Sequence, residues 1–220
     1  MGNGRNGAAG SAALIVIDVQ NDFTTGSMAV PGAAQIIEPI NRLAEAFELV
    51  VTVQDWHPNG HVSFASTHPG ARHRDTVQLE HGPQRVFHDH CIQGTPGAEL
   101  DPGLRLTKAS LVLRKGCRRD VDSHSAFVEN DGRTTTGLAG YLRARGVERL
   151  YCVGLTRYGC VMMSAVDAAR EGFSVTIVDD ACEDRDLGPK EAAEADRTLA
   201  ALAIGRIDTD ALLAATGIST

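Results

Sequence analysis

Short apolar runs, each ending in polar or charged residues, recur along this sequence and restrict the folds that it can adopt. The first run, Ala12 to Ile17, is followed directly by Asp18. Continuous apolar runs of this kind are typical of parallel strands that are buried on both faces. Strands that alternate with helices form a parallel sheet that is covered on both sides, with right-handed crossovers. We therefore predict an α/β fold.

The predicted strands and helices alternate along the chain. Strands are expected over 12–17, 49–53, 110–113, 149–153 and 173–178, with a short edge strand over 204–208. Helical spacing of apolar residues predicts helices over 33–47, 134–145, 161–172 and 191–202. Pro39 lies inside the first of these helices and predicts a kink or a late start. We expect a single-domain, open, Rossmann-type parallel sheet of about six strands with helices on both faces.

A segment from Ser66 to Leu106 interrupts this alternation. It has few periodic apolar residues and holds five of the eight histidines. Long irregular segments within compact domains are usually functional loops or lids, so we expect a loop or lid here. Four of its histidines are expected to be solvated at the surface: His68, His73, His81 and His88.

Length and charge argue against several classes of protein. The chain has 220 residues, a net charge of −7 and no dense run of Lys or Arg, which argues against a nucleic-acid partner. No apolar stretch approaches the roughly 18 residues needed to span a bilayer, so no membrane partner is expected. Residues 1–11 lack the apolar core of a signal peptide and are predicted to be a flexible tail before one domain over 12–220. Five widely spread cysteines do not suggest a disulfide framework, which favours a reducing, cytoplasmic setting.

Residues that can carry chemistry stand where the predicted strands end. Asp18, Asp55 and Lys115 each follow an apolar run, and Cys160 lies in the first turn of the helix after the strand over 149–153. The carboxyl ends of parallel strands meet at one edge of a sheet, where such folds bind their ligands. Helix N-terminal N–H groups lower the pKa of a thiol, and a nearby carboxylate and cation would activate it as a nucleophile. Taken alone, a single cysteine in such a turn is better interpreted as a small buried hydrophobic residue.

Asp55 and His57 are candidate metal ligands. They lie two residues apart in an extended segment and therefore on the same side of the chain. A carboxylate and an imidazole together suit Zn²⁺, Fe²⁺ or Mn²⁺, and His90 offers a further imidazole. A hydrogen-bonded Asp–His pair without a metal is the alternative, and these two residues do not decide between them.

The chain carries five longer motifs. They are ALIVIDVQNDF, QDWHPNGHVSFAS, DHCIQGTPGAEL, RKGCRRDVDSHSAF and CVGLTRYGCVMMSAVDAAREGF, which end at residues 23, 66, 100, 127 and 173. The motifs resemble the nicotinamidase/pyrazinamidase branch of the isochorismatase-like cysteine hydrolases, and the resemblance covers residues 12–208. It implies a six-stranded parallel sheet and an Asp–Lys–Cys triad at Asp18, Lys115 and Cys160.

The same resemblance implies one divalent metal ion. Its ligands would be Asp55, His57 and His90, and His61 matches a residue that ligates in some members and not in others. Zinc is the ion we expect, with iron or manganese as alternatives. In the family, the substrate is an amide with a pyridine-type ring, and the resemblance implies that the metal binds the ring nitrogen and so orients the ring.

The turn before Cys160 departs from the family pattern. The resemblance implies an oxyanion hole made by the backbone N–H groups of Thr156 and Cys160, beside a cis peptide bond at Leu155-Thr156. Family members usually carry a small residue, then Thr-Asp and an aromatic residue, before the cysteine. This chain has Thr156, Arg157, Tyr158 and Gly159 in those places, and Phe87 stands where a Trp-Pro pair is common. We expect the unusual side chains to point away from the pocket and to leave the substrate unchanged.

These observations predict an amidase that converts nicotinamide to nicotinate and ammonia through a thioester, as a step in NAD salvage. Candidate residues for the substrate pocket are Phe23, Phe127 and Tyr158, and either phenylalanine could instead be ordinary core. A related amidase for another small amide or carbamoyl substrate is one alternative, and a non-catalytic binding protein on the same fold is another. The expected partner is a small-molecule amide, and a homo-oligomer stays open.

Overall fold

The computed structural model describes residues 11–184 and 188–216. Within these ranges six strands form a parallel sheet in the order β5-β2-β1-β6-β7-β8. Their bounds are β1 Ser11–Ile17, β2 Val50–Asp55, β5 Ala109–Lys115, β6 Val147–Leu155, β7 Ser174–Glu183 and β8 Gly205–Ile207. The predicted α/β class and the parallel sheet, including its short edge strand, are confirmed.

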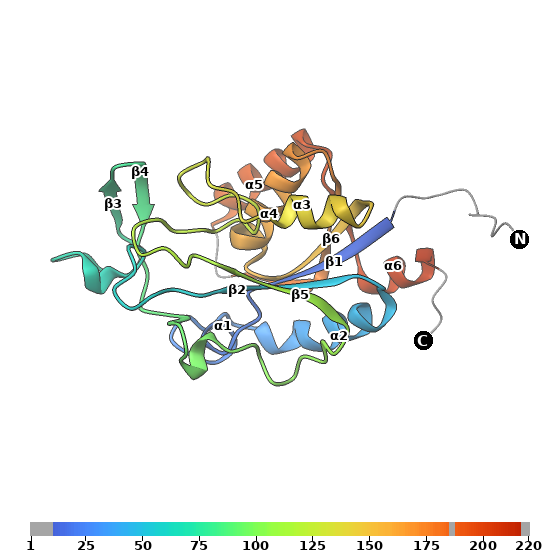
Figure 1. The fold of residues 1–220 in the computed structure, drawn as a ribbon, viewed down its shortest axis with the longest axis horizontal. Helices are drawn as coiled ribbons and strands as arrows, with labels where there is room; N and C mark the ends of the chain where they lie inside the picture. Colours follow the sequence, from blue (N-terminus) through green and yellow to red (C-terminus); the bar gives the residue numbers. More distant parts are fainter. Residues whose placement is uncertain (1–10, 185–187, 217–220) are drawn as a thin grey trace, which may run out of the picture.

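Helices cover both faces of the sheet, as Figure 1 shows. One face carries α3 (Leu138–Ala144), α4 (Met162–Arg170) and α5 (Pro189–Ala201), and the other carries α1 (Asn21–Thr24), α2 (Ile37–Ala46) and α6 (Thr209–Thr216). Central strand β1 serves both layers, because Ile15 packs into the first core and Val16 into the second, each at most 1% exposed. Burying such a side chain stabilises the fold by about 1.5–3 kcal/mol.

Two predicted helices begin later than expected. The helix predicted over 33–47 starts with a 3₁₀ turn, Ala33–Ile36, and becomes α-helical at Ile37. Pro39 lies in the first turn of α2, where its missing N–H has no intrahelical acceptor, so the late start is confirmed. The helix predicted over 134–145 begins at Leu138, because Thr134 and Thr136 make backbone hydrogen bonds to an earlier loop.

Strand β7 is longer than predicted. Asp179 and Asp180 were expected to follow the strand, but they lie inside it. The pairing of β6 with β7 shifts here, since Cys152 pairs with Ile177 whereas Gly154 pairs with Cys182. This wide bulge frees the Asp180 carboxylate to accept hydrogen bonds from Thr209, the first residue of α6. The prediction that β7 ends at these carboxylates is therefore wrong.

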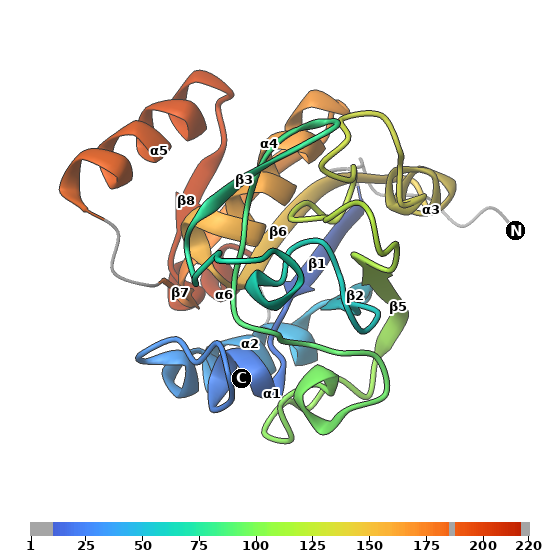
Figure 2. The ribbon, with the colours of Figure 1, turned by 90° about the vertical axis from the view of Figure 1, so that its left-hand side faces the viewer.

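The irregular segment over 66–106 contains more structure than predicted. Strands β3 (Thr76–Leu79) and β4 (Gly82–Arg85) form an antiparallel hairpin that lies beyond the carboxyl ends of the sheet strands (Figures 1 and 2). His88 is exposed, whereas the other three histidines predicted to be solvated are half-buried.

The predicted N-terminal tail falls mostly outside the described residues. Residues 1–10 are not described, and Ser11, which was assigned to the tail, is the first residue of β1. Among the described residues, no helix has the length and apolar character that a membrane crossing requires.

Candidate active site

The strand ends that were predicted to carry chemistry lie next to one another, because β5, β2, β1 and β6 are consecutive in the sheet. Lys115 is the last residue of β5, Asp55 is the last residue of β2, and the two are partners in the strand register. Asp18 follows β1 directly, and Cys160 follows β6 after a short turn. The structure thus brings these four predicted residues together at one edge of the sheet.

Lys115 lies at the centre of this cluster. Its Nζ is 2.9 Å from Oδ2 of Asp18, 2.5 Å from Oδ1 of Asp55 and 3.6 Å from Sγ of Cys160. It also donates a hydrogen bond to the carbonyl oxygen of Ser123 at 2.9 Å. Burial lowers the pKa of Lys115, but the carboxylates of Asp18 and Asp55 outweigh burial and raise it well above its usual value. The lysine is therefore a permanent cation that holds two buried carboxylates together.

Asp18 has the protonation behaviour of a group that can both take and give a proton. Burial raises its pKa to about 7 with a further contribution from Asp55, against the opposing effect of Lys115. Neither carboxylate oxygen accepts a well-directed hydrogen bond from the part of the chain that the structure describes, although Lys115 forms a close ion pair with one of them. A carboxylate with free lone pairs and a pKa near neutrality suits general acid–base catalysis.

Cys160 lies close to the start of a helix, as predicted, but its electrostatic environment differs from the predicted one. The backbone kinks at Gly159, whose φ of −111° and ψ of −114° are not helical, and Cys160 follows this kink just before α4. Burial raises the pKa of the Cys160 thiol, and Lys115 lowers it. Asp18 and Asp55 add to the rise, so the thiol pKa lies well above its usual value. The predicted lowering of the thiol pKa is therefore wrong, because it left out the burial of the thiol and the carboxylates from neighbouring strands. Forming the thiolate requires a proton acceptor, and Asp18 is adjacent.

The backbone around Cys160 is held very close to β1. Gly154 has a φ of +117°, and a Cβ atom at this position would overlap the carbonyl oxygen of Ile17. A side chain there would push β6 away from β1, so glycine serves the packing of the two strands. The peptide bond between Leu155 and Thr156 is cis, as the family resemblance implies.

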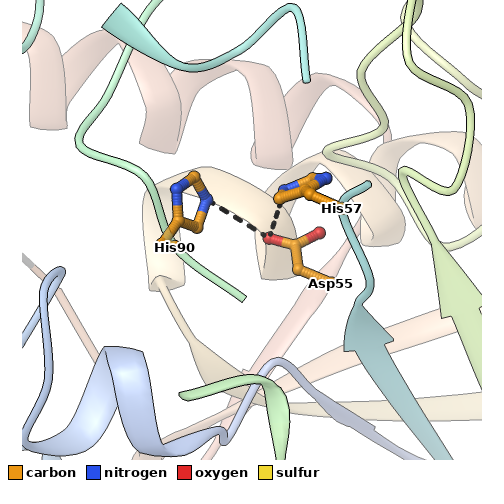
Figure 3. A group of neighbouring side chains, drawn as sticks. All are labelled: Asp55, His57 and His90. Carbon is orange, nitrogen blue, oxygen red and sulfur yellow. Dashed lines mark ion pairs between the residues drawn. The ribbon is translucent and has the colours of Figure 1, made fainter. Parts of the chain in front are cut away.

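Asp55, His57 and His90 form a group that could hold a metal ion (Figure 3). Nε2 of His57 is 3.6 Å and Nε2 of His90 is 3.9 Å from Oδ2 of Asp55, so neither of these contacts is a hydrogen bond. Nδ1 of His57 lies 3.0 Å from the carbonyl oxygen of Gly116, and Nδ1 of His90 lies 2.7 Å from that of His88. A carbonyl oxygen only accepts, so both Nδ1 atoms carry a proton and both Nε2 atoms are left as ligands.

The pKa values of Asp55 and His90 agree with a shared metal site. Burial lowers the pKa of His57, but Asp55 outweighs burial and raises it above the usual value, so metal binding would compete with protonation of this imidazole. Burial raises the pKa of Asp55, but Lys115 and His57 lower it well below the usual value. Burial lowers the pKa of His90 to about 4, with His57 adding to the effect. Asp55 is therefore ionised and His90 is neutral at pH 7, as ligation of a divalent ion requires. Two imidazoles and a carboxylate are a donor set that fits zinc.

His61 is less suited to ligation. Its ring stacks on that of His57 at 4.1 Å, but Nδ1 lies 2.7 Å from Oγ of Ser63 and Nε2 lies 3.2 Å from the carbonyl oxygen of Val121. His57, His61 and Asp122 make a second candidate metal group by proximity. Both ring nitrogens of His61 already have hydrogen-bond partners there, so the group with His90 is the better metal site.

The nucleophile and the metal group open into one cavity with a volume of about 430 Å³. Phe23 and Tyr158 line it, as predicted, and Phe87 forms another part of the wall. Phe127 does not line it: this side chain is 2% exposed and packs against Phe173 in the core below α3 and α4. The pocket prediction therefore does not hold for Phe127, because the strand–helix pattern does not show which face of its loop turns inward.

Comparisons with known proteins agree with this arrangement. The sequence model of the isochorismatase domain family matches residues 12–204 of this chain. The chain belongs to the isochorismatase family. A nicotinamidase of Acinetobacter baylyi is 50% identical over 180 residues, which cover 81% of this chain and 84% of that protein. The solved structure of an Acinetobacter baumanii nicotinamidase pyrazinamidase is 45% identical, with a TM-score of 0.89 over 92% of this chain and 98% of that one.

A further solved structure in the family bears on the metal group. It is that of a Pyrococcus horikoshii pyrazinamidase in complex with zinc, which is 30% identical to this chain. Its TM-score is 0.72, and the match covers 90% of this chain and 99% of that one. Together with the donor set of Asp55, His57 and His90, this likeness supports a divalent-metal site in the present member of the family.

The side chains of Arg157 and Tyr158, the two unusual residues before Cys160, lie on different sides of the cavity wall. Arg157 points away from the cavity, as expected, and donates to the carbonyl oxygens of Asp179 and Cys182 at 2.7 and 2.8 Å, on the bulge of β7. Tyr158 lines the cavity, while its hydroxyl donates to Asp196 of α5 at 2.9 Å. The expectation that both side chains leave the cavity therefore holds for Arg157 and not for Tyr158.

Sequence reasoning missed Asp122 and Ser123, which line the cavity beside the metal group. Burial raises the pKa of Asp122, but His124, His57 and His61 lower it to about 2, so it stays ionised at neutral pH. Asp122 and Ser123 follow no apolar run, and no spacing in the sequence marks them. The RKGCRRDVDSHSAF motif contains both residues and is the signal that could have drawn attention to them.

Proposed function

We propose that this protein hydrolyses nicotinamide to nicotinate and ammonia. The observation that carries the proposal is a thiol that lines a cavity together with an Asp-His-His group, with a buried lysine close to both the thiol and an acid–base carboxylate. The similar proteins of the family that carry the name nicotinamidase support the same substrate. Return of nicotinate to NAD synthesis in the cytoplasm is the physiological setting that we propose.

The first half of the proposed reaction forms a thioester. Asp18 takes the proton of the Cys160 thiol while Lys115, 3.6 Å from the sulfur, stabilises the thiolate. The thiolate attacks the amide carbon, and the backbone N–H groups of Thr156 and Cys160 stabilise the oxyanion that forms. Asp18 returns its proton to the amide nitrogen, the C–N bond breaks, and ammonia leaves.

The second half releases nicotinate. Asp18, again a carboxylate, takes a proton from water as the water oxygen attacks the thioester carbon. The C–S bond breaks, the oxygen stays in the product carboxylate, and Cys160 regains its proton. One water is consumed for each ammonia released. A pKa of about 7 for Asp18 allows both directions of proton transfer near neutral pH.

The metal site that we propose consists of Asp55, His57 and His90, and zinc is the ion that we propose for it. A divalent ion supplies a Lewis acid, which can hold the nitrogen of a pyridine ring. The protein itself orients these ligands: Gly116 and His88 accept hydrogen bonds from the two imidazoles, and Lys115 neutralises the other oxygen of Asp55. Phe23 and Phe87 supply apolar wall beside the site.

A panel of amides tests this proposal. Ammonia release would be measured with nicotinamide, pyrazinamide, benzamide and an aliphatic amide. Nicotinamide and pyrazinamide should exceed benzamide by about 100-fold or more in kcat/KM, because benzamide lacks the ring nitrogen and loses roughly 2.7 kcal/mol of transition-state binding. Faster hydrolysis of the aliphatic amide than of nicotinamide would overturn the assignment of substrate, and no hydrolysis of any amide would favour a binding protein.

A further inference from the structure

We infer that Gln84 is a positioning residue, which anchors the β3–β4 hairpin over the active site and links it to Lys115. In the hairpin strands, Gln84 is the one side chain that is buried, with 2% of the residue exposed. It comes from β4, and its partners come from the loop that follows β5, so the contact joins segments far apart in sequence. The hairpin otherwise presents half-buried or exposed residues.

Both ends of the Gln84 amide have partners. Its Nε2 donates to Oδ2 of Asp122 at 2.8 Å and to the carbonyl oxygen of Arg85 at 2.8 Å, and its Oε1 accepts from Nδ2 of Asn130 at 3.3 Å. Asp122 is itself 4% exposed, so this is a buried hydrogen bond from an amide to a carboxyl group. Such bonds are shorter and stronger than those between neutral groups, and a buried carboxylate that loses its donor is destabilised.

A chain of hydrogen bonds leads from this anchor to the catalytic lysine. Oδ1 of Asp122 accepts from the backbone N–H of Ser123 at 2.8 Å. The carbonyl oxygen of Ser123 accepts from Nζ of Lys115 at 2.9 Å. The hairpin is therefore joined to Lys115 through Asp122 and the backbone of Ser123.

The same anchor sets the position of the cavity wall. Arg85 and Phe87, close to Gln84 along the chain, both line the cavity. The ring of Phe87 packs edge-on against those of His90 and His124, at centroid distances of 6.2 and 6.4 Å. If Gln84 loses Asp122, β4 can shift and take this wall away from the metal group. We therefore expect KM for the substrate to rise and the thiol of Cys160 to become more accessible to reagents.

An exchange of donor and acceptor tests the anchor. Gln84→Glu sets a carboxylate against Asp122, and Gln84→Met removes the hydrogen bonds while keeping an unbranched side chain. The double variant Gln84→Glu/Asp122→Asn restores one hydrogen bond with its polarity reversed, because the introduced asparagine can donate to the introduced glutamate and still accept from Ser123. Gln78→Glu is the matched control, since Gln78 is exposed on the same hairpin and its amide donates a hydrogen bond to the carbonyl oxygen of the adjacent Leu79.

Three readouts are compared at pH 8 in metal-loaded protein: amide hydrogen exchange in β3 and β4, alkylation of Cys160 by iodoacetamide, and KM and kcat for nicotinamide. Each Gln84 single variant should speed exchange and alkylation by about tenfold, because losing one buried hydrogen bond shifts the opening equilibrium of the hairpin by about this factor. Each should also raise KM more than it lowers kcat. In hydrogen exchange, the double variant should lie closer to the native protein than Gln84→Glu does, since its hydrogen bond to residue 122 is rebuilt. Gln78→Glu should change nothing.

Unchanged exchange in the single variants, or a double variant no better than Gln84→Glu, would overturn the inference. The KM readout rests on the proposed function, whereas exchange and alkylation do not. If the native protein fails to hydrolyse nicotinamide but exchange still follows the donor–acceptor swap, the substrate is wrong and the anchor stands.

Discussion

Replacing Lys115 by methionine removes the cation from a buried cluster of two carboxylates. In the native protein its Nζ is 2.9 Å from Asp18 and 2.5 Å from Asp55, and its side chain is fully buried. Methionine has a similar unbranched shape, so the change is mainly one of charge. Removing one partner of a buried ion pair typically costs about 3–5 kcal/mol, and we expect the free energy of unfolding to fall by this amount at pH 8.

The pH dependence of this loss separates a charge effect from a packing effect. With Lys115 present, the pKa of Asp18 is about 7, against an ordinary value of 3.8 for an aspartate. Because it is raised in the folded state, the native protein loses stability as pH rises towards 7 and then levels off. Without Lys115 the pKa of Asp18 rises further, so the variant continues to lose up to about 1.4 kcal/mol per pH unit above pH 7.

Urea unfolding between pH 5 and pH 9, on protein of matched metal content, measures both quantities. Lys108→Met is the control: Lys108 is exposed and its Nζ bonds the carbonyl oxygen of Glu45, so a change within about 0.5 kcal/mol is expected. A Lys115→Met deficit that stays constant from pH 7 to pH 9 would refute the electrostatic reasoning and leave only a packing effect.

Three further predictions concern the metal, the strand contact and the base. His57→Ala and His90→Ala should each lose most of the bound divalent ion in elemental analysis, and full occupancy in both would remove them from the site. Gly154→Ala should lower the free energy of unfolding in urea by more than about 4 kcal/mol, because the added Cβ would overlap β1. Gly140→Ala is the control: it has open space in α3 and should raise the free energy of unfolding by up to about 1 kcal/mol. Equal effects of the two variants would contradict the close approach of β6 to β1. The kcat/KM for nicotinamide should fall as pH drops below about 7 through protonation of Asp18, and a flat profile from pH 5 to pH 8 would exclude that role.

The convergence of Asp18, Asp55, Lys115 and Cys160 could be predicted from sequence because parallel strands end at the same edge. The pattern of apolar runs does not contain the strand order, so the pairing of Lys115 with Asp55 could not be predicted from it. The rise in the thiol pKa could not be predicted either, since it depends first on burial and then on carboxylates that other strands supply. Local motifs describe the helix amides near a cysteine but not its long-range neighbours.

Other features lay beyond sequence reasoning for different physical reasons. Helix α1 has 4 residues and α6 has 8, too short for apolar periodicity to stand out. The bulge that places Asp179 and Asp180 inside β7 depends on pairing with β6 and leaves no local trace. The buried contact of Gln84 with Asp122 joins the short strand β4 to the loop after β5, and both residues are of polar types that are normally expected to be solvated.

Ammonia release by Cys160→Ala is the most direct test of the thioester mechanism. The account predicts that kcat for nicotinamide falls by about 1,000-fold or more, because Cys160 supplies the one thiol among the described residues that line the cavity. Metal content and the urea midpoint should stay close to those of the native protein, and Cys117→Ala, which changes an exposed cysteine, should keep full activity. A Cys160→Ala variant that retains more than about one tenth of the native kcat would contradict the mechanism.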